Sequence, residues 1–215
     1  AFNFDLYYEA DLRACMHKYF KLTENLYPDL LYEARVLSMG RQTLGVASGF
    51  FGPNNSVIAD FGGVLKRLDR SRFDIVYINI VEKGHRDEYP FPDHPHIDVL
   101  AYEDNWMQKA RQRIEERGFD LILYLDSTMA PSVQQLMMSK LARVQAVSHG
   151  HPVTSGIPKD IVQYFVSWGA AELPTAQDHY TEELILLRSE CMHQYYEHRV
   201  GADGNSTITR QPCGN

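Results

Sequence analysis

Short apolar runs bounded by polar or turn residues recur along the chain and predict the strands of a parallel sheet. The runs lie at residues 43–49, 73–80, 96–100, 119–125, 143–148 and 161–167. Several place β-branched and aromatic residues at consecutive positions, as in Ile75, Val76 and Tyr77, which is typical of strands covered on both faces. These runs are long enough for strands and far too short to cross a bilayer.

Stretches with apolar residues at helical spacing lie around and between these runs. They predict helices over residues 5–22, 56–68, 105–117, 130–141 and 176–187. The first is expected to pack against the body of the domain, and the last carries acidic residues toward its start. Strands that alternate with helices of about ten to fifteen residues indicate βαβ units. The expected fold is therefore α/β and doubly wound, with a mostly parallel sheet and helices on both faces.

The length of 215 residues suits one compact domain with short appendages. We expect a helical segment over residues 1–40, a Rossmann-like lobe over 41–190, and a polar tail or the start of a second lobe over 191–215. The net charge of -7, without a basic cluster, argues against binding to nucleic acid or to a membrane surface. Three cysteines far apart in sequence favour a reducing compartment. Because the chain carries no signal-like stretch, the expected location is the cytoplasm.

The turns that follow the predicted strands are the first candidates for a ligand site, because ligands of open parallel sheets bind beyond the carboxyl ends of the strands. Four such turns lie at residues 49–56, 126–128, 148–156 and 168–172. The first lacks the glycine pattern of a dinucleotide site and the Lys-Ser/Thr of a phosphate loop, which disfavours a plain NAD or ATP site. In the second, Asp126 is a candidate base or a partner that orients a histidine, or else a plain turn residue.

The turn at residues 148–156 has the richest chemistry. Its glycines allow a ligand to approach the backbone, and its Thr and Ser residues offer hydroxyl and amide groups. This combination predicts a site for a sugar and a phosphate. Two other interpretations remain: the turn is only a tight connection, or His149 and His151 bind zinc together with His94 and His96. The histidine spacing lacks the form of a known zinc site, so we predict no metal.

An ordered set of sequence blocks resembles the O-linked N-acetylglucosamine transferase family and its bacterial relatives. The blocks lie at 43–51, 54–57, 141–146, 150–156, 164–167 and 176–184, and the resemblance covers roughly residues 43–187. It implies the first lobe of a two-lobed GT-B glycosyltransferase that is inverting, metal-independent and without a cofactor. Such an enzyme moves N-acetylglucosamine or a hexose from a UDP-sugar donor to a protein or peptide acceptor. The resemblance matches Gly150, Pro152 and Thr154 to the sugar-contacting loop.

The family's second lobe, which holds most of the nucleotide site, would follow residue 187. We therefore expect the chain to be an incomplete transferase, inactive alone and able to self-associate through the face that a second lobe would cover. Relatives carry a histidine where this chain has Asn55, whose amide cannot act as a base near neutral pH.

Two other functions remain open. One is a non-catalytic module that binds a glycan, a peptide or a protein, and the other is an enzyme of another doubly wound family, such as an epimerase or a reductase. The predicted catalytic residues are Asn55, Asp126, His149 and His151, and the predicted substrate-binding residues are Gly150, Pro152, Thr154, Ser155 and Gly156.

Overall fold

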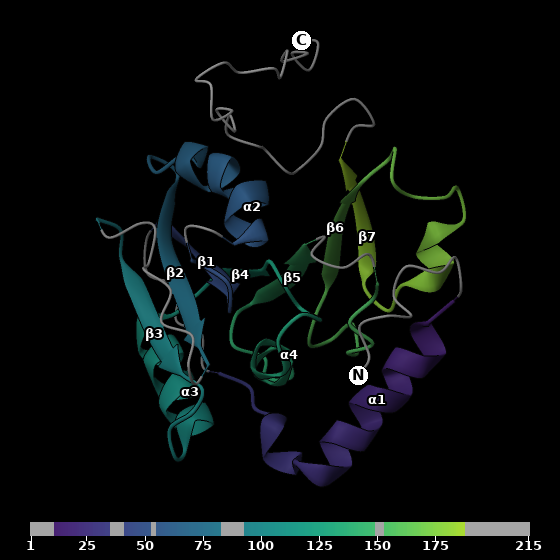
Figure 1. The fold of residues 1–215 in the computed structure, drawn as a ribbon, viewed down its shortest axis with the longest axis horizontal. Helices are drawn as coiled ribbons and strands as arrows, with labels where there is room; N and C mark the ends of the chain where they lie inside the picture. Colours follow the sequence, from purple (N-terminus) through teal and green to yellow (C-terminus); the bar gives the residue numbers. More distant parts are fainter. Residues whose placement is uncertain (1–10, 35–40, 53–54, 83–92, 149–152, 188–215) are drawn as a thin grey trace.

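The computed structural model describes residues 11–34, 41–52, 55–82, 93–148 and 153–187 (Figure 1). Seven of its strands form one sheet: β1 Gln42–Ser48, β2 Phe73–Val81, β3 His96–Leu100, β4 Leu121–Tyr124, β5 Val144–Ser148, β6 Tyr164–Trp168 and β7 Glu183–Leu187. The helices are α1 Arg13–Leu26, α2 Ser56–Arg67, α3 Trp106–Arg117 and α4 Pro131–Met137, with 3-10 turns η2 Pro28–Leu30 and η3 Ala176–His179.

The strand order is β3-β2-β1-β4-β5-β6-β7, and every neighbouring pair is parallel. The first strand, β1, lies in the middle of the sheet. The next two strands, β2 and β3, add to one side of it, and the chain then crosses over so that β4 lies on the other side of β1. Gly45 of β1 pairs with Val76 of β2 and with Ile122 of β4, so the reversal of strand order lies between β1 and β4. The predicted α/β, Rossmann-like fold is confirmed.

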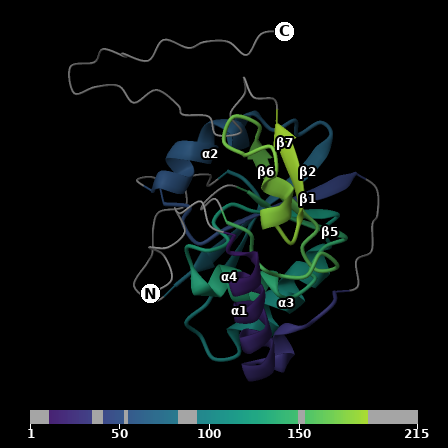
Figure 2. The ribbon, with the colours of Figure 1, turned by 90° about the vertical axis from the view of Figure 1, so that its right-hand side faces the viewer.

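Helices cover both faces of the sheet, as predicted. On one face α2 packs against β1 and β2, and on the other α1, α3 and α4 share a larger core. Alternate strand residues divide between these cores: Val46 and Tyr77 face α2, whereas Ala47 and Ile78 face the larger core. Figures 1 and 2 show α2 apart from α1, α3 and α4 in two perpendicular views.

A buried arginine connects the segment from α1 to residue 34 with the rest of the domain. Arg111 of α3 donates from Nε to Ser139 Oγ over 3.1 Å and also donates to the carbonyl oxygen of Asp29. Its guanidinium lies over the Tyr32 ring, 5.1 Å from the ring centre. The backbone amide of Ala34 donates to the Lys140 carbonyl over 2.8 Å. The predicted first helix thus exists at Arg13–Leu26, and residues 5–10 of that prediction lie outside the described residues.

The predicted last helix over 176–187 is wrong. A 3-10 turn occupies Ala176–His179, and the chain then forms β7, which pairs with β6. The Gln177 side chain ends the helical turn, because it donates to the Glu182 carbonyl and accepts from the Leu184 amide, each over 2.9 Å. The prediction failed because hydrophobic periodicity cannot distinguish a strand from a helix in an apolar run as short as that of β7. The predicted helix over 130–141 is also shorter, since α4 ends at Met137.

Candidate active site at the carboxyl ends of the strands

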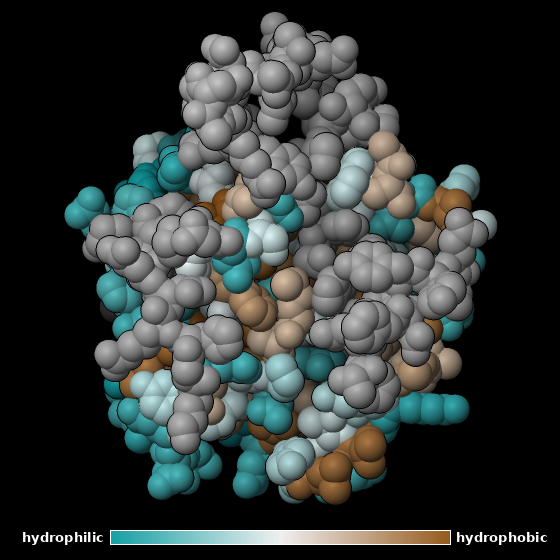
Figure 3. All heavy atoms as spheres, viewed as in Figure 1, coloured by the Kyte–Doolittle hydropathy of each residue, from teal (hydrophilic) through white to brown (hydrophobic). Residues whose placement is uncertain are grey.

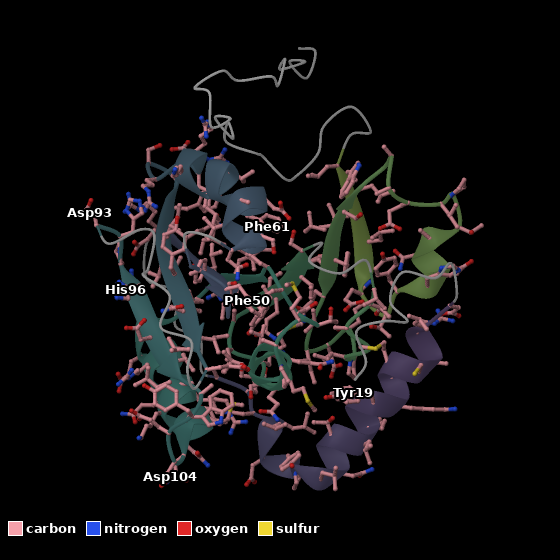
Figure 4. All side chains as sticks on the ribbon, in the orientation of Figure 1. Tyr19, Phe50, Phe61, Asp93, His96 and Asp104 are labelled. Atoms are coloured by element: carbon pink, nitrogen blue, oxygen red, sulfur yellow. The ribbon has the colours of Figure 1, made fainter. Side chains whose placement is uncertain are left out.

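The loops that follow β1 and β4 meet where the strand order reverses, which is the usual ligand position in such sheets. Asp126 ties the two loops together, because its Oδ2 accepts from the Gly49 amide over 3.0 Å. Beside it, Ser48 Oγ accepts from the Phe50 amide over 2.9 Å. Figure 4 shows Phe50 near the middle of the molecule, and its side chain packs against the cores on both faces.

Asp126 is fully buried, and burial raises its pKa from 3.8 to about 7. Hydrogen bonds from the Gly49 amide and the Ser48 side chain act in the opposite direction, and the charge of Glu82 adds a smaller upward effect. Within the described residues, Asp126 Oδ1 has no hydrogen-bond partner. A buried carboxyl group that titrates near neutral pH can hold or release a proton, as a general acid or base must.

Asn55 lies on the same rim, in the loop between β1 and α2. Its Oδ1 accepts from the Val57 amide over 3.0 Å, so the side chain caps the first turn of α2. Ser56 is the first residue of the helix. The cap shows a structural role for Asn55, and the predicted role in catalysis stays a prediction.

The described part of the loop after β5 is buried from Val153 to Ile157, and its hydroxyl groups point to one carboxylate. Thr154 Oγ1 donates to Glu182 Oε2 over 2.6 Å, and the Ser155 amide donates to Oε1 over 2.9 Å. The sequence analysis did not identify Glu182 as a site residue, because it placed Glu182 among the acidic residues at the start of the predicted helix over 176–187. The direct role predicted for Thr154 and Ser155 in substrate binding stays a prediction.

Gly156 holds this loop against α1. Its φ of 73° is a left-handed conformation, and a Cβ atom would lie less than 3.0 Å from the Met16 backbone. His17 Nδ1 lies 3.3 Å from the Gly156 carbonyl oxygen, within hydrogen-bond distance. The glycine therefore allows a close helix-to-loop contact. His149, Gly150, His151 and Pro152 lie outside the described residues, so their predicted roles stay predictions.

The zinc interpretation also involves the two histidines near the start of β3. His94 and His96 are at the amino end of β3, whereas His149 directly follows the carboxyl end of β5 in sequence. Figure 4 shows His96 at the outer edge of the sheet. Three strands separate β3 from β5, which corresponds to about 19 Å between the two strands. Among the described residues, no group of three or more His, Cys, Asp or Glu side chains could hold a metal ion.

Exposed apolar side chains gather at the end of α1 and just after it. Leu22, Leu26 and Tyr27 are more than half exposed, and Leu31 is 42% exposed. Figure 3 shows apolar surface in this part of the molecule. The predicted self-association concerns the face that a second lobe would cover, not this patch, and it stays a prediction. No described helix is long and apolar enough to cross a membrane.

Comparison with solved structures relates the fold to a glycosyltransferase. The chain is similar to an O-GlcNAc transferase mutant from Thermobaculum terrenum, with a TM-score of 0.62 and 16% sequence identity. The similarity covers 85% of this chain, which spans 34% of that protein's chain. No family model and no curated protein matches the sequence. At this identity the similarity shows the fold alone, which is α/β and Rossmann-like.

Proposed function

We propose that this chain forms the acceptor-side lobe of a UDP-sugar-dependent, inverting and metal-independent glycosyltransferase that modifies protein side chains. The observation that carries the proposal is Asp126, a buried titratable carboxyl group at the point where the strand order reverses. The GT-B-like fold supports it, and so does the sequence resemblance over the loop after β5. N-acetylglucosamine or a hexose is the proposed donor sugar.

Asp126 would act as the proton acceptor in this function. An acceptor hydroxyl group must lose its proton as it attacks the sugar, and a carboxylate with a pKa of about 7 is well matched to that step near neutral pH. The Gly49 amide fixes Oδ2 over 3.0 Å, so Oδ1, which is also buried, is the oxygen that would take the proton once an acceptor hydroxyl group reaches it. Asn55 would contribute hydrogen bonding only, since its amide has no basic site.

The chain spans about a third of its structural neighbour, so donor binding, rather than sugar transfer, is the property to test on the chain itself. We expect UDP-N-acetylglucosamine or another UDP-sugar to raise the melting temperature, since a ligand that binds only the folded state stabilises it. At ten times Kd the gain is about 1.4 kcal/mol, or roughly 3–5 °C for a domain of this size. GDP-mannose and ATP serve as controls. No shift with any UDP-sugar, or an equal shift with the controls, would contradict donor binding by this lobe.

The chemical role of Asp126 requires a separate measurement of sugar transfer. In a protein that joins this chain to the second lobe, and where transfer to a peptide library is detected by mass spectrometry, Asp126→Asn is expected to lower kcat by about 10²–10⁴-fold, with a smaller change in the KM for the donor. Asp120→Asn is the matched control, because Asp120 Oδ2 makes the equivalent 3.0 Å contact with the Thr43 amide at the opposite end of the same two strands. Equal rates in wild type and Asp126→Asn would remove Asp126 from the chemistry.

A non-catalytic binding module is the second candidate. The observation that favours it is the commitment of Asn55 Oδ1 to the cap of α2. Such a module would bind a glycan, a peptide or a protein without turning over a UDP-sugar. Stabilisation by free N-acetylglucosamine oligomers or by acceptor peptides, without any response to UDP-sugars, would favour this candidate over the transferase lobe.

A further inference from the structure

A buried carboxylate outside the reaction centre holds the loop that follows β5. Glu182 is 1% exposed, and both of its carboxylate oxygens accept hydrogen bonds from that loop. Oε1 accepts from the amide and the hydroxyl group of Ser155, and Oε2 accepts from Thr154 Oγ1 and, over 3.1 Å, from Thr181 Oγ1. Among the described residues, no cation forms a salt bridge with Glu182. Its burial is therefore compensated by the loop's own amide and hydroxyl groups.

The hydroxyl group of Thr154 is the centre of this hydrogen-bond network. It also accepts from the Thr181 amide over 3.0 Å and from the Gly156 amide over 3.3 Å. The Ser155 hydroxyl accepts in turn from the Ile157 amide over 3.1 Å. The network thus fixes the backbone from Thr154 to Ile157.

A second element holds the same loop from another side. Met16 of α1 packs with Val153, and the Met16 backbone lies against Gly156. Residues far apart in sequence thus fix one short segment, which contains the predicted substrate-binding residues Thr154, Ser155 and Gly156. Because ordering a loop costs free energy, a loop that is already fixed binds a ligand at lower entropic cost.

We propose that Glu182 is a positioning residue for residues 153–157 of the loop after β5: it preorganises this segment, so affinity for the donor sugar depends on a side chain that does not touch the ligand. This inference rests on the proposed function. It also assigns Thr154 and Ser155 a role through the shape of the loop, since their hydroxyl groups are directed to Glu182. Neither spacing nor composition marks Glu182 for this role.

The test combines amide hydrogen exchange of the free chain with calorimetric binding of UDP-N-acetylglucosamine. Glu182→Ala removes the acceptor of the Ser155 amide, so we expect exchange at Ser155 to accelerate by about tenfold or more. Exchange at Val46, in the centre of the sheet, should change much less. Kd for the UDP-sugar should rise by about tenfold or more, because the loop must then be ordered on binding.

Two variants separate positioning from general destabilisation. Glu182→Gln should recover part of both effects, since hydroxyl groups can rotate to accept from the new amide. Glu183→Ala removes the neighbouring exposed carboxylate, which pairs only with Lys159 at the surface in the described structure, and should behave as wild type. If Glu182→Ala does not fold, Thr154→Val removes the central hydroxyl group instead and should give the same two changes.

Several results would overturn the proposal. Unchanged exchange at Ser155 in the variant would mean that Glu182 does not hold the loop. Faster exchange with an unchanged Kd would mean that the loop's order does not matter for binding. If the wild-type chain binds no UDP-sugar, the proposed contribution of this lobe to donor binding fails, whereas the exchange data still decide whether Glu182 orders the loop.

Discussion

Asp126→Asn gives a prediction whose sign and size follow from burial. Burial raises the pKa of Asp126 from 3.8 to about 7, so the folded state keeps a proton that the unfolded chain loses near pH 4. The folded state therefore loses stability as pH rises from about 4 to about 7, by about 1.4 kcal/mol per pH unit. Asparagine is neutral throughout and keeps an oxygen for the Gly49 amide. Relative to Asp126→Asn, the wild type should lose about 2.5 kcal/mol between pH 5 and pH 8.

Urea unfolding of both proteins at pH 5, 6, 7 and 8 measures this difference. The comparison cancels the pH dependence of the other titrating groups, because the two proteins differ at one side chain. A difference that stays constant within about 0.5 kcal/mol across this range would refute the reasoning, since it would place the pKa of Asp126 outside the window. A wild type that gains stability relative to the variant at high pH would show a favoured carboxylate, which is the opposite sign.

Further substitutions test the packing around the site by the same urea titration. Gly156→Ala should cost at least about 2 kcal/mol, because its φ is 73° and a Cβ atom would collide with Met16. Gly62→Ala in α2, where a Cβ atom would make only an ordinary contact, should instead change stability by no more than about 1 kcal/mol, in the stabilising direction. Arg111→Met should cost about 2 kcal/mol, because buried acceptors lose their donor. Asn55→Ala should cost about 1 kcal/mol through loss of the helix cap, whereas Asn55→Asp should not.

Much of the fold follows from hydrophobic patterning. The apolar runs predict β1 to β6, because strands covered on both faces need nearly continuous apolar residues. The pattern fails at β7, an edge strand whose Ile185 and Leu186 are exposed, so that partner strands rather than periodicity decide its conformation. Element boundaries also shift: β4 covers Leu121–Tyr124, whereas its apolar run spans residues 119–125, although the Leu125 amide still donates to the Ala47 carbonyl.

The candidate site could be predicted only in part. Asp126 stands out in the sequence because it follows a buried strand, but its full burial and raised pKa depend on how β1 and β4 are joined. Glu182 gives no such signal, since its main partner Ser155 is 27 residues away and the contact exists only once β6 and β7 are paired. Gly156 reads as a turn residue, whereas its neighbour Met16 comes from the first helix.

The most direct test of the account is a titration of the amide NMR spectrum of the chain with UDP-N-acetylglucosamine at millimolar concentration. If the ligand site lies at the carboxyl ends of the strands, shift changes should cluster at Gly49, Phe50, Ser155 and Gly156. Residues at the opposite end of the strands, such as Thr43, should not respond. Changes confined to that opposite end would contradict the account, and so would a spectrum that does not change at millimolar ligand.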